Sequence, residues 1–337
     1  MRRSDRHRKK RWKRSLFIFL MAIFLSLLAG VTYYATSIYQ FLDEVTMSDG
    51  ASPSMNEEKL LIEEKKPFSI LLLGMDMDIN LSSRTDTIMV ATINPDSNDM
   101  KLVSIPRDTL VETNFGFTEK INAMYTYGGI DLMTTEVEKI LDIPISHYAI
   151  LDFKGLAELV DVVGGIQVYS DLEFTESNSL NYNEPIEIKE GLQTLNGEEA
   201  LGYSRMRKQD PRGDFGRQER QQQVVEALLD ELLSLNLLTN FNPILEATSP
   251  YLKTNLTGNQ MLSLAMNYRD AVNNIDTYQI AGEDRIEYFP HYGLNVYTFI
   301  PFEESLGEVS EELQDHLNVH SRHSTTEQLQ TSDELKE

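Results

Sequence analysis

Apolar residues recur along residues 67–301 with two different periods, and these periods predict the secondary structure. Continuous apolar runs bounded by turn residues predict strands buried on both faces. Such runs occur at 68–74, 87–94, 101–105, 147–152 and 165–169. Apolar residues at helical spacing predict helices at 131–141, 154–163 and 217–235, with a further helix beginning near Thr257. Strands that alternate with helices predict an α/β sandwich with a central, mostly buried sheet.

The N-terminal segment has a different pattern, in which a basic stretch precedes a long uncharged one. The first fourteen residues hold nine Lys or Arg and one Asp, and no charged residue follows until Asp43. A helix needs roughly 20 apolar residues to cross a bilayer, and a basic flank stays in the cytoplasm. A signal peptide cleaved near Ala29-Gly30 is the alternative.

These patterns divide the chain into five parts. We predict a cytoplasmic basic segment, a transmembrane signal-anchor helix, an extracellular tether, one catalytic domain, and an acidic, disordered tail with at most one short helix. Their ranges are 1–14, 15–36, 37–66, 67–301 and 302–337. This organisation predicts a single-pass protein of the cell membrane whose N-terminus is cytoplasmic and whose catalytic domain is extracellular.

Net charge and the lack of cysteine narrow the possible functions. The formal net charge is -23, of which residues 1–14 contribute +8, so residues 15–337 carry -31. An ectodomain this acidic repels nucleic acid, which is therefore not an expected partner. The chain has no cysteine, so disulfide bonds and a thiol nucleophile are excluded.

A cluster of five arginines at residues 205–221 contrasts with this acidic background. In the helix predicted after it, Arg217 and Gln221 fall on the apolar stripe and Arg220 lies at its edge. That stripe consists of Val224, Val225, Leu228, Leu229 and Leu232. A guanidinium directed inward needs an anion, because an unpaired buried charge is strongly unfavourable. The pattern predicts a phosphate or a buried carboxylate opposite these arginines.

Carboxylates follow or precede several predicted strands. Asp76 and Asp78 come after the strand at 68–74, Asp86 precedes the next strand, and Asp108 follows the third. Ligands bind at the carboxyl ends of strands in α/β sheets, and paired Asp residues without Cys or His suit a hard cation such as Mg²⁺. Alternatively, Asp86 and Asp108 cap turns or pair with neighbouring arginines. Together with the arginine cluster, the first interpretation suits a pyrophosphate ester.

The ordered motifs resemble those of the LytR-CpsA-Psr family over about residues 67–235, in addition to the single N-terminal span. The motifs are Gly74-Met-Asp76, Arg84-Thr-Asp86-Thr, Ser104-Ile-Pro-Arg107-Asp108, Lys120-Ile-Asn122-Ala, Gly128-Gly129, Val160-Asp-Val-Val-Gly-Gly165, Leu195-Asn-Gly197, Ala200-Leu-Gly-Tyr-Ser-Arg205-Met-Arg207 and Asp214-Phe-Gly-Arg217-Gln-Glu-Arg220-Gln221. The resemblance implies a central mixed β-sheet flanked by helices. It also implies a membrane-anchored enzyme of a Gram-positive envelope. Such enzymes transfer an anionic glycopolymer, for example wall teichoic acid or capsule, from a polyprenyl-pyrophosphate lipid to peptidoglycan through a phosphodiester.

The resemblance further assigns roles to residues of this chain. Asp76 and Asp86 match Mg²⁺-binding (or Mn²⁺-binding) carboxylates, and either is a candidate to accept the proton of the attacking hydroxyl. The positions lining the pyrophosphate are Arg84, Arg107, Arg205, Arg207, Arg217 and Gln221, of which Arg84, Arg107 and Arg217 are assigned to catalysis. Asp214 matches a position that orients the arginines. Met77-Asp78 departs from the family pattern, which leaves a metal contact of Asp78 open.

A hydrophobic pocket for the lipid tail is implied under the sheet. Two other functions remain: a non-catalytic envelope regulator or sensor, and a polyprenyl-pyrophosphate hydrolase.

Overall fold

The computed structural model of the chain describes residues 62, 64–75, 84–113, 116–179, 184–234, 244, 247–272 and 274–319. The predicted basic segment, the membrane span, most of the tether and the metal-site candidates Asp76 and Asp78 lie outside these residues. In the part of the chain that is described, no helix combines the length and apolar character that a membrane span requires.

A mixed six-stranded sheet forms the centre of the domain, with strand order β11-β6-β1-β2-β3-β12. The strands are β1 (Phe68–Met75), β2 (Thr85–Asn94), β3 (Asp99–Ser104), β6 (His147–Asp152), β11 (Leu252–Thr254) and β12 (Ile275–Gln279). The β1 strand pairs parallel with β6 and antiparallel with β2, whereas β12 pairs parallel with β3. The fold class and the strand predicted at 68–74 are therefore confirmed.

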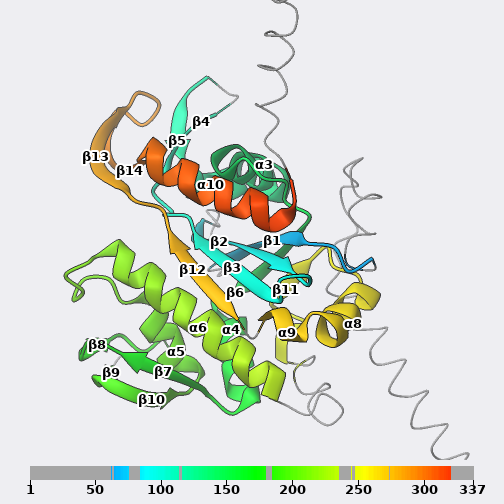
Figure 1. Cartoon of the computed structure of the whole chain (residues 1–337). Coiled ribbons are helices and arrows are strands. Elements are labelled where there is room, and N and C mark those ends of the chain that lie inside the picture. The colour runs from blue at the N-terminus through cyan, green and yellow to red at the C-terminus, as the bar shows by residue number, and fades with distance from the viewer. Residues whose placement is uncertain are drawn as a thin grey trace, which may run out of the picture. The chain divides into compact units, whose positions relative to one another are not determined.

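Helices cover both faces of this sheet (Figure 1). The helices of the domain are α3 (Met124–Leu141), α4 (Phe153–Val163), α5 (Gly197–Arg205), α6 (Asp214–Ser234), α8 (Gly258–Asn267), α9 (Arg269–Val272) and α10 (Glu303–Leu317), and a short 3₁₀ helix covers Ile121–Ala123. Alternate residues of β1 point to opposite faces. Leu71 and Leu73 pack in the core under α3 and α10, while Phe68 and Ile70 pack in the core that contains α8 and α9.

A third hydrophobic core lies on the side of α6 that faces away from the central sheet. It joins α4, α5 and α6 to the short strands β7 (Ile166–Ser170), β8 (Phe174–Glu176), β9 (Ile186–Ile188) and β10 (Gly191–Leu195). The strand predicted at 165–169 is β7, which pairs with β10 rather than joining the central sheet. Its buried residues alternate with exposed Gln167 and Tyr169, as expected of a sheet with one face in solvent.

Two β-hairpins extend from the end of the central sheet where β3 terminates. They are formed by β4 (Leu110–Glu112) with β5 (Thr118–Lys120), and by β13 (Gly282–Phe289) with β14 (Leu294–Pro301). An isolated bridge between Thr109 and Phe299 connects the segments that carry them. The hairpins therefore place residues of β14 next to the loop that follows β3.

The C-terminal boundary predicted at residue 301 is too early. Helix α10 buries Val309, Leu313 and Leu317 in the same core as β1 and α3. Its residue His316 contacts Thr92 Oγ1 through Nδ1 at 2.7 Å and Asp99 Oδ1 through Nε2 at 2.8 Å. The numerous glutamates of this segment suggested a solvated tail, but they occupy only the outer face of an amphipathic helix.

Replacing Leu313 with alanine is expected to lower the free energy of unfolding by about 2–4 kcal/mol. The Leu313 side chain extends from α10 into the core, where it is fully buried, so its removal leaves a cavity. Urea denaturation monitored by circular dichroism measures this change. Glu311→Ala on the exposed face of the same helix is the control, with an expected change below about 0.5 kcal/mol. Equal stability of Leu313→Ala and the unmodified protein would show that α10 is not part of the core.

Candidate active site

Charged side chains from three segments meet at the end of the sheet where β3 terminates and β2 begins. Asp86 lies in the second position of β2, and Arg107 and Asp108 lie in the turn after β3. Arg207 belongs to the loop before α6, whereas Arg217 lies in the first turns of that helix. Side chains of Gln222 and Gln279 bond to the carbonyls of Tyr278 and Phe215, at 2.9 and 3.0 Å respectively, and so fix α6 against β12.

Three arginines and two carboxylates form the centre of this site, which we call the arginine cluster: Asp86, Arg107, Arg207, Asp214 and Arg217. Arg107 Nη1 forms an ion pair with Asp86 Oδ1. Arg217 Nη2 lies 2.6 Å from Asp214 Oδ1, and Arg207 Nε lies 3.8 Å from the same oxygen. The predicted role of Asp214 in orienting arginines is consistent with these contacts.

The arginine cluster carries more positive than negative charge. Burial lowers the pKa of Arg217, and the positive charges of Arg107 and Arg207 add to this effect against the carboxylates of Asp214 and Asp86. Among the described residues, the Nε groups of Arg107 and Arg217 are buried donors without a hydrogen-bond acceptor. Buried donors of this kind are normally satisfied, and guanidinium groups in general pair well with phosphate oxygens.

Asp108 is part of a neighbouring ion-pair network. Lys120 Nζ donates to Asp108 Oδ1 at 2.7 Å, and Arg107 Nε lies 3.7 Å from Asp108 Oδ2. Of the two alternatives for the carboxylates, pairing with arginine is therefore observed for both Asp86 and Asp108. Such pairing does not exclude ligand binding, because the carboxylate of Asp86 remains about one-third exposed.

Arg220 has a purely structural environment, although it is the most deeply buried arginine of the 205–221 segment. Its Nη1 donates to Asp210 Oδ2 at 2.5 Å, its Nε donates to the Tyr203 carbonyl at 3.2 Å, and its Nη2 donates to the Met206 carbonyl. Burial opposes ionisation of Asp210, but hydrogen bonds from Arg212 and Arg220 lower its pKa to about 2. A buried carboxylate is therefore the anion opposite Arg220.

Gly216 permits this buried pair to form. A Cβ atom at position 216 would lie 1.8 Å from Asp210 Oδ2, so any larger residue would displace the carboxylate. Sequence reasoning did not identify Asp210, although the rule that a buried arginine requires an anion applied to it. The glycine in Asp214-Phe-Gly216-Arg217 is a signal for close packing at this point.

The remaining predicted site residues differ in their positions. Arg84 is exposed immediately before β2, two residues from Asp86. Arg205 ends α5 and donates to the Ser177 carbonyl at 3.4 Å, a contact away from the arginine cluster. Gln221 is buried one helical turn after Arg217. The structure thus brings together Asp86, Arg107, Arg207, Asp214 and Arg217, and places Gln221 beside them.

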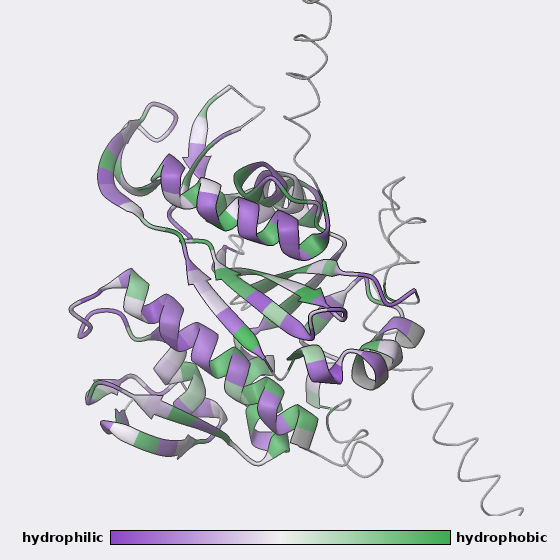
Figure 2. Ribbon diagram, viewed as in Figure 1, coloured by the Kyte–Doolittle hydropathy of each residue, from purple (hydrophilic) through white to green (hydrophobic). Residues whose placement is uncertain are grey.

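An apolar cavity of about 550 Å³ separates the central sheet from α6. Strands β1, β2 and β6 form one wall, and Val224, Val225 and Leu228 of α6 form another. Gln221, Ser204 and Thr87 line it as well, so its polar end adjoins the arginine cluster. Figure 2 shows the corresponding change along α6, whose first turns are mostly hydrophilic and whose later turns are rich in hydrophobic residues. The cavity matches the pocket implied under the sheet.

The described residues supply only part of a binding site for a hard cation. Within the described residues, no group of three or more His, Cys, Asp or Glu side chains is arranged to hold a metal ion. Magnesium commonly uses one or two carboxylates together with substrate phosphates and water. Asp86 supplies one such carboxylate, and its partly exposed oxygens retain capacity to accept further ligands.

The fold and site define an α/β protein that combines a partly buried arginine cluster with a large apolar cavity. The model of the LytR_cpsA_psr family matches residues 32–315 of the chain. The chain therefore belongs to the LytR_cpsA_psr family, and the resemblance drawn from its motifs is confirmed. The match also includes most of α10, which agrees with the corrected boundary of the domain.

Several related proteins share most of this chain. The polyisoprenyl-teichoic acid–peptidoglycan teichoic acid transferase TagU of Bacillus cereus is 38% identical over 277 residues, which cover 80% of this chain and 89% of that protein. A crystal structure described as a transcriptional regulator from Enterococcus faecalis has a TM-score of 0.67 at 32% identity, covering 79% of this chain and 94% of that one. TagT bound to LIIa-WTA has a TM-score of 0.63 at 28% identity and covers 81% and 95% of the two chains.

Proposed function

We propose that this protein is a phosphotransferase that moves an anionic glycopolymer from a polyprenyl-pyrophosphate lipid to peptidoglycan. The observation that carries the proposal is the arginine cluster, in which three guanidinium groups meet two carboxylates next to the polar end of the apolar cavity. The cluster suits a pyrophosphate and the cavity suits the adjoining isoprenoid units. The names of TagU and of TagT bound to LIIa-WTA support a wall teichoic acid or similar polymer as the donor.

The arginines account for stabilisation of charge during transfer. A hydroxyl oxygen of peptidoglycan forms a new bond to the glycan-proximal phosphorus, and the bond from that phosphorus to the bridging oxygen breaks. Polyprenyl phosphate leaves with the bridging oxygen, whose developing negative charge is stabilised by Arg107, Arg207 and Arg217. The hydroxyl proton passes to whichever of the Asp86 and Asp76 carboxylates is not fully committed to the cation.

Mg²⁺ or Mn²⁺ is part of the proposal, held by Asp86 and Asp76. A cation held there would neutralise part of the phosphate charge. Arg107, which pairs with Asp86, positions that carboxylate beside the phosphate-binding arginines. The predicted membrane helix at 15–36 would keep the domain outside the cell and within reach of a lipid carrier, as expected for a protein of a Gram-positive envelope.

Transfer by the full-length chain in detergent micelles tests the function. The assay supplies a polyprenyl-pyrophosphate-linked disaccharide, Mg²⁺ and peptidoglycan fragments, and mass spectrometry detects the phosphodiester product. Release of the disaccharide phosphate to water in place of transfer would identify a hydrolase. Tight binding of the donor without either product would favour a regulator or sensor, a role suggested by the description of the Enterococcus faecalis structure.

Replacing Val225 with tryptophan is expected to lower kcat/KM for a long-chain donor about tenfold or more, because the indole occupies the apolar cavity that Val225 lines. A donor with a two-isoprene chain should be affected less than threefold. Asp230→Trp places the same side chain on the exposed side of α6 and serves as the control. Equal loss with both donors would contradict the assignment of the cavity to the lipid tail.

A further inference from the structure

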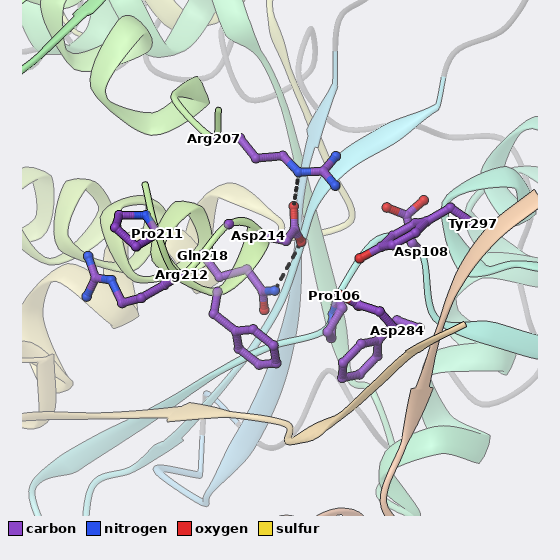
Figure 3. A pocket seen from close by; sticks show the side chains of 12 residues that line it. Pro106, Asp108, Arg207, Pro211, Arg212, Asp214, Gln218, Asp284 and Tyr297 are labelled. Carbon is purple, nitrogen blue, oxygen red and sulfur yellow. Dashed lines mark hydrogen bonds and ion pairs between the residues drawn. The ribbon is translucent and has the colours of Figure 1, made fainter. Parts of the chain in front are cut away.

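A second, smaller pocket lies beside the arginine cluster and is lined mainly by polar groups. Its volume is about 210 Å³, and its lining includes Asp108, Arg207, Asp214, Gln218, Asp284 and Tyr297. In Figure 3, Arg207, Asp214 and Gln218 lie on one side of this polar pocket, and Asp108 and Tyr297 lie on the other. The two sides come from the start of α6 and from the segments after β3 and in β14.

The start of α6 lines the polar pocket together with Arg207, and the apolar cavity begins with Gln221, further along the same helix. Asp214 and Gln218, in the first turns, line the polar pocket. Arg217 belongs to the cluster, and Gln221, one turn later, lines the apolar cavity. A pyrophosphate held by Arg217 would therefore direct its lipid end along α6 towards the cavity, and its opposite side would face the polar pocket.

The polar groups of this pocket are suited to hydroxyl groups. Gln218 is 4% exposed, and its amide nitrogen donates to Asp214 Oδ2 at 3.2 Å. Its Oε1 atom is buried and has no hydrogen-bond donor among the described residues. Burial and a hydrogen bond to Asp284 raise the pKa of Tyr297, so its phenol stays protonated. Carboxylates, an amide oxygen and arginines offer acceptors and donors, and Phe215 and Phe299 add apolar surface.

We propose that the polar pocket binds a sugar ring of the peptidoglycan acceptor and presents its hydroxyl group to the phosphorus. The inference rests on the proposed function. Phosphoryl transfer places the attacking and leaving oxygens roughly in line on either side of the phosphorus. With the leaving lipid phosphate on the cavity side, the attacking oxygen must approach from the side of the polar pocket. The donor's own glycan stays bonded to the same phosphorus and extends to the side of the line that joins the attacking and leaving oxygens.

Steady-state kinetics of the full-length chain in detergent test this assignment with Asp284→Ala and Tyr297→Ala. The probes are a polyprenyl-pyrophosphate-linked disaccharide as donor and a peptidoglycan tetrasaccharide as acceptor. The KM for the acceptor should rise about tenfold in each variant, whereas the KM for the donor should change less than twofold. Glu283→Ala, on the same exposed hairpin but outside the pocket, should change neither value.

Other outcomes would separate the two proposals. A rise in the KM for the donor, with the acceptor value unchanged, would place the donor's glycan in the pocket and overturn the inference. Unchanged values for both substrates would also overturn it. Absence of transfer by the unmodified protein would instead refute the proposed function. Asp284→Asn, which keeps the shape of the side chain, should reproduce the defect, and equal melting temperatures of all variants would exclude misfolding as its cause.

Discussion

Replacing Arg217 with alanine is expected to lower the rate of transfer about 10³-fold, the magnitude typical of an arginine that stabilises phosphoryl transfer. Arg217 is 6% exposed, and its Nε group lacks an acceptor among the described residues. Its guanidinium pairs with Asp214 and carries one of the positive charges of the arginine cluster that the proposed function assigns to the pyrophosphate. Single-turnover transfer with saturating donor measures the effect on the chemical step.

The control for this prediction is Lys208→Ala, which removes an exposed cation from the loop before α6. It should leave the rate within about twofold. Because Arg217→Ala leaves Asp214 paired with Arg207, its fold should be retained, and circular dichroism can verify this. A rate within threefold of the unmodified protein would show that Arg217 serves only to balance the charge of Asp214.

Replacing Arg220 with methionine is expected to lower the free energy of unfolding by about 2–3 kcal/mol, because it removes one of the two guanidinium partners of the buried Asp210 carboxylate and leaves only Arg212. Urea denaturation at pH 7 measures the loss. The folded-state pKa of Asp210, about 2, lies below its ordinary value of 3.8. The pair therefore contributes fully above about pH 4, and the difference between variant and unmodified protein should shrink as the pH falls towards 2.

A double variant tests the cause of this destabilisation. Asp210→Leu combined with Arg220→Met removes both charges and should recover most of the stability lost in the single variant, because an apolar pair avoids the desolvation of the ions. If the double variant were as unstable as the sum of the two single variants, packing rather than unpaired charge would explain the loss. These variants would thus show that Arg217 acts in transfer, whereas Arg220, three residues later on α6, contributes to stability.

Much of the fold could be predicted because its strands and helices have strong local patterns. The run Phe68–Gly74 is buried on both faces and forms the middle of the sheet, as its lack of alternation indicated. The apolar stripe of α6 correctly placed Arg217 and Gln221 inside the protein. The prediction of a disordered tail for most of α10 was wrong. It rested on the many glutamates of the segment, whereas the spacing of Leu306, Val309, Leu313 and Leu317 is that of an amphipathic helix.

The site was less predictable, because contacts between distant segments leave little local signal. Asp210 and Arg220 lie close in sequence, but only the folded structure, in which Gly216 leaves room for the carboxylate, shows that they pair. Asp284 and Tyr297 are more than seventy residues beyond Arg207 and carry no motif that links them to it. Their approach to the site depends on the bridge between Thr109 and Phe299, a tertiary contact. Asp76 remains a prediction, because it lies outside the described residues.

Under the proposed function, the apolar cavity would make the stability of the domain depend on whether a lipid is bound. Ile70, Met89 and Met100 belong to the hydrophobic cluster that holds α8 and α9 on the sheet, and the same side chains line the cavity. An isoprenoid chain seated there would extend that cluster, so binding and folding share contacts. By mass action, a ligand at about one hundred times its Kd adds about 2.7 kcal/mol to the stability of the folded state. The protein would therefore resist unfolding and proteolysis best while loaded, and its survival in the envelope would follow the supply of lipid-linked polymer.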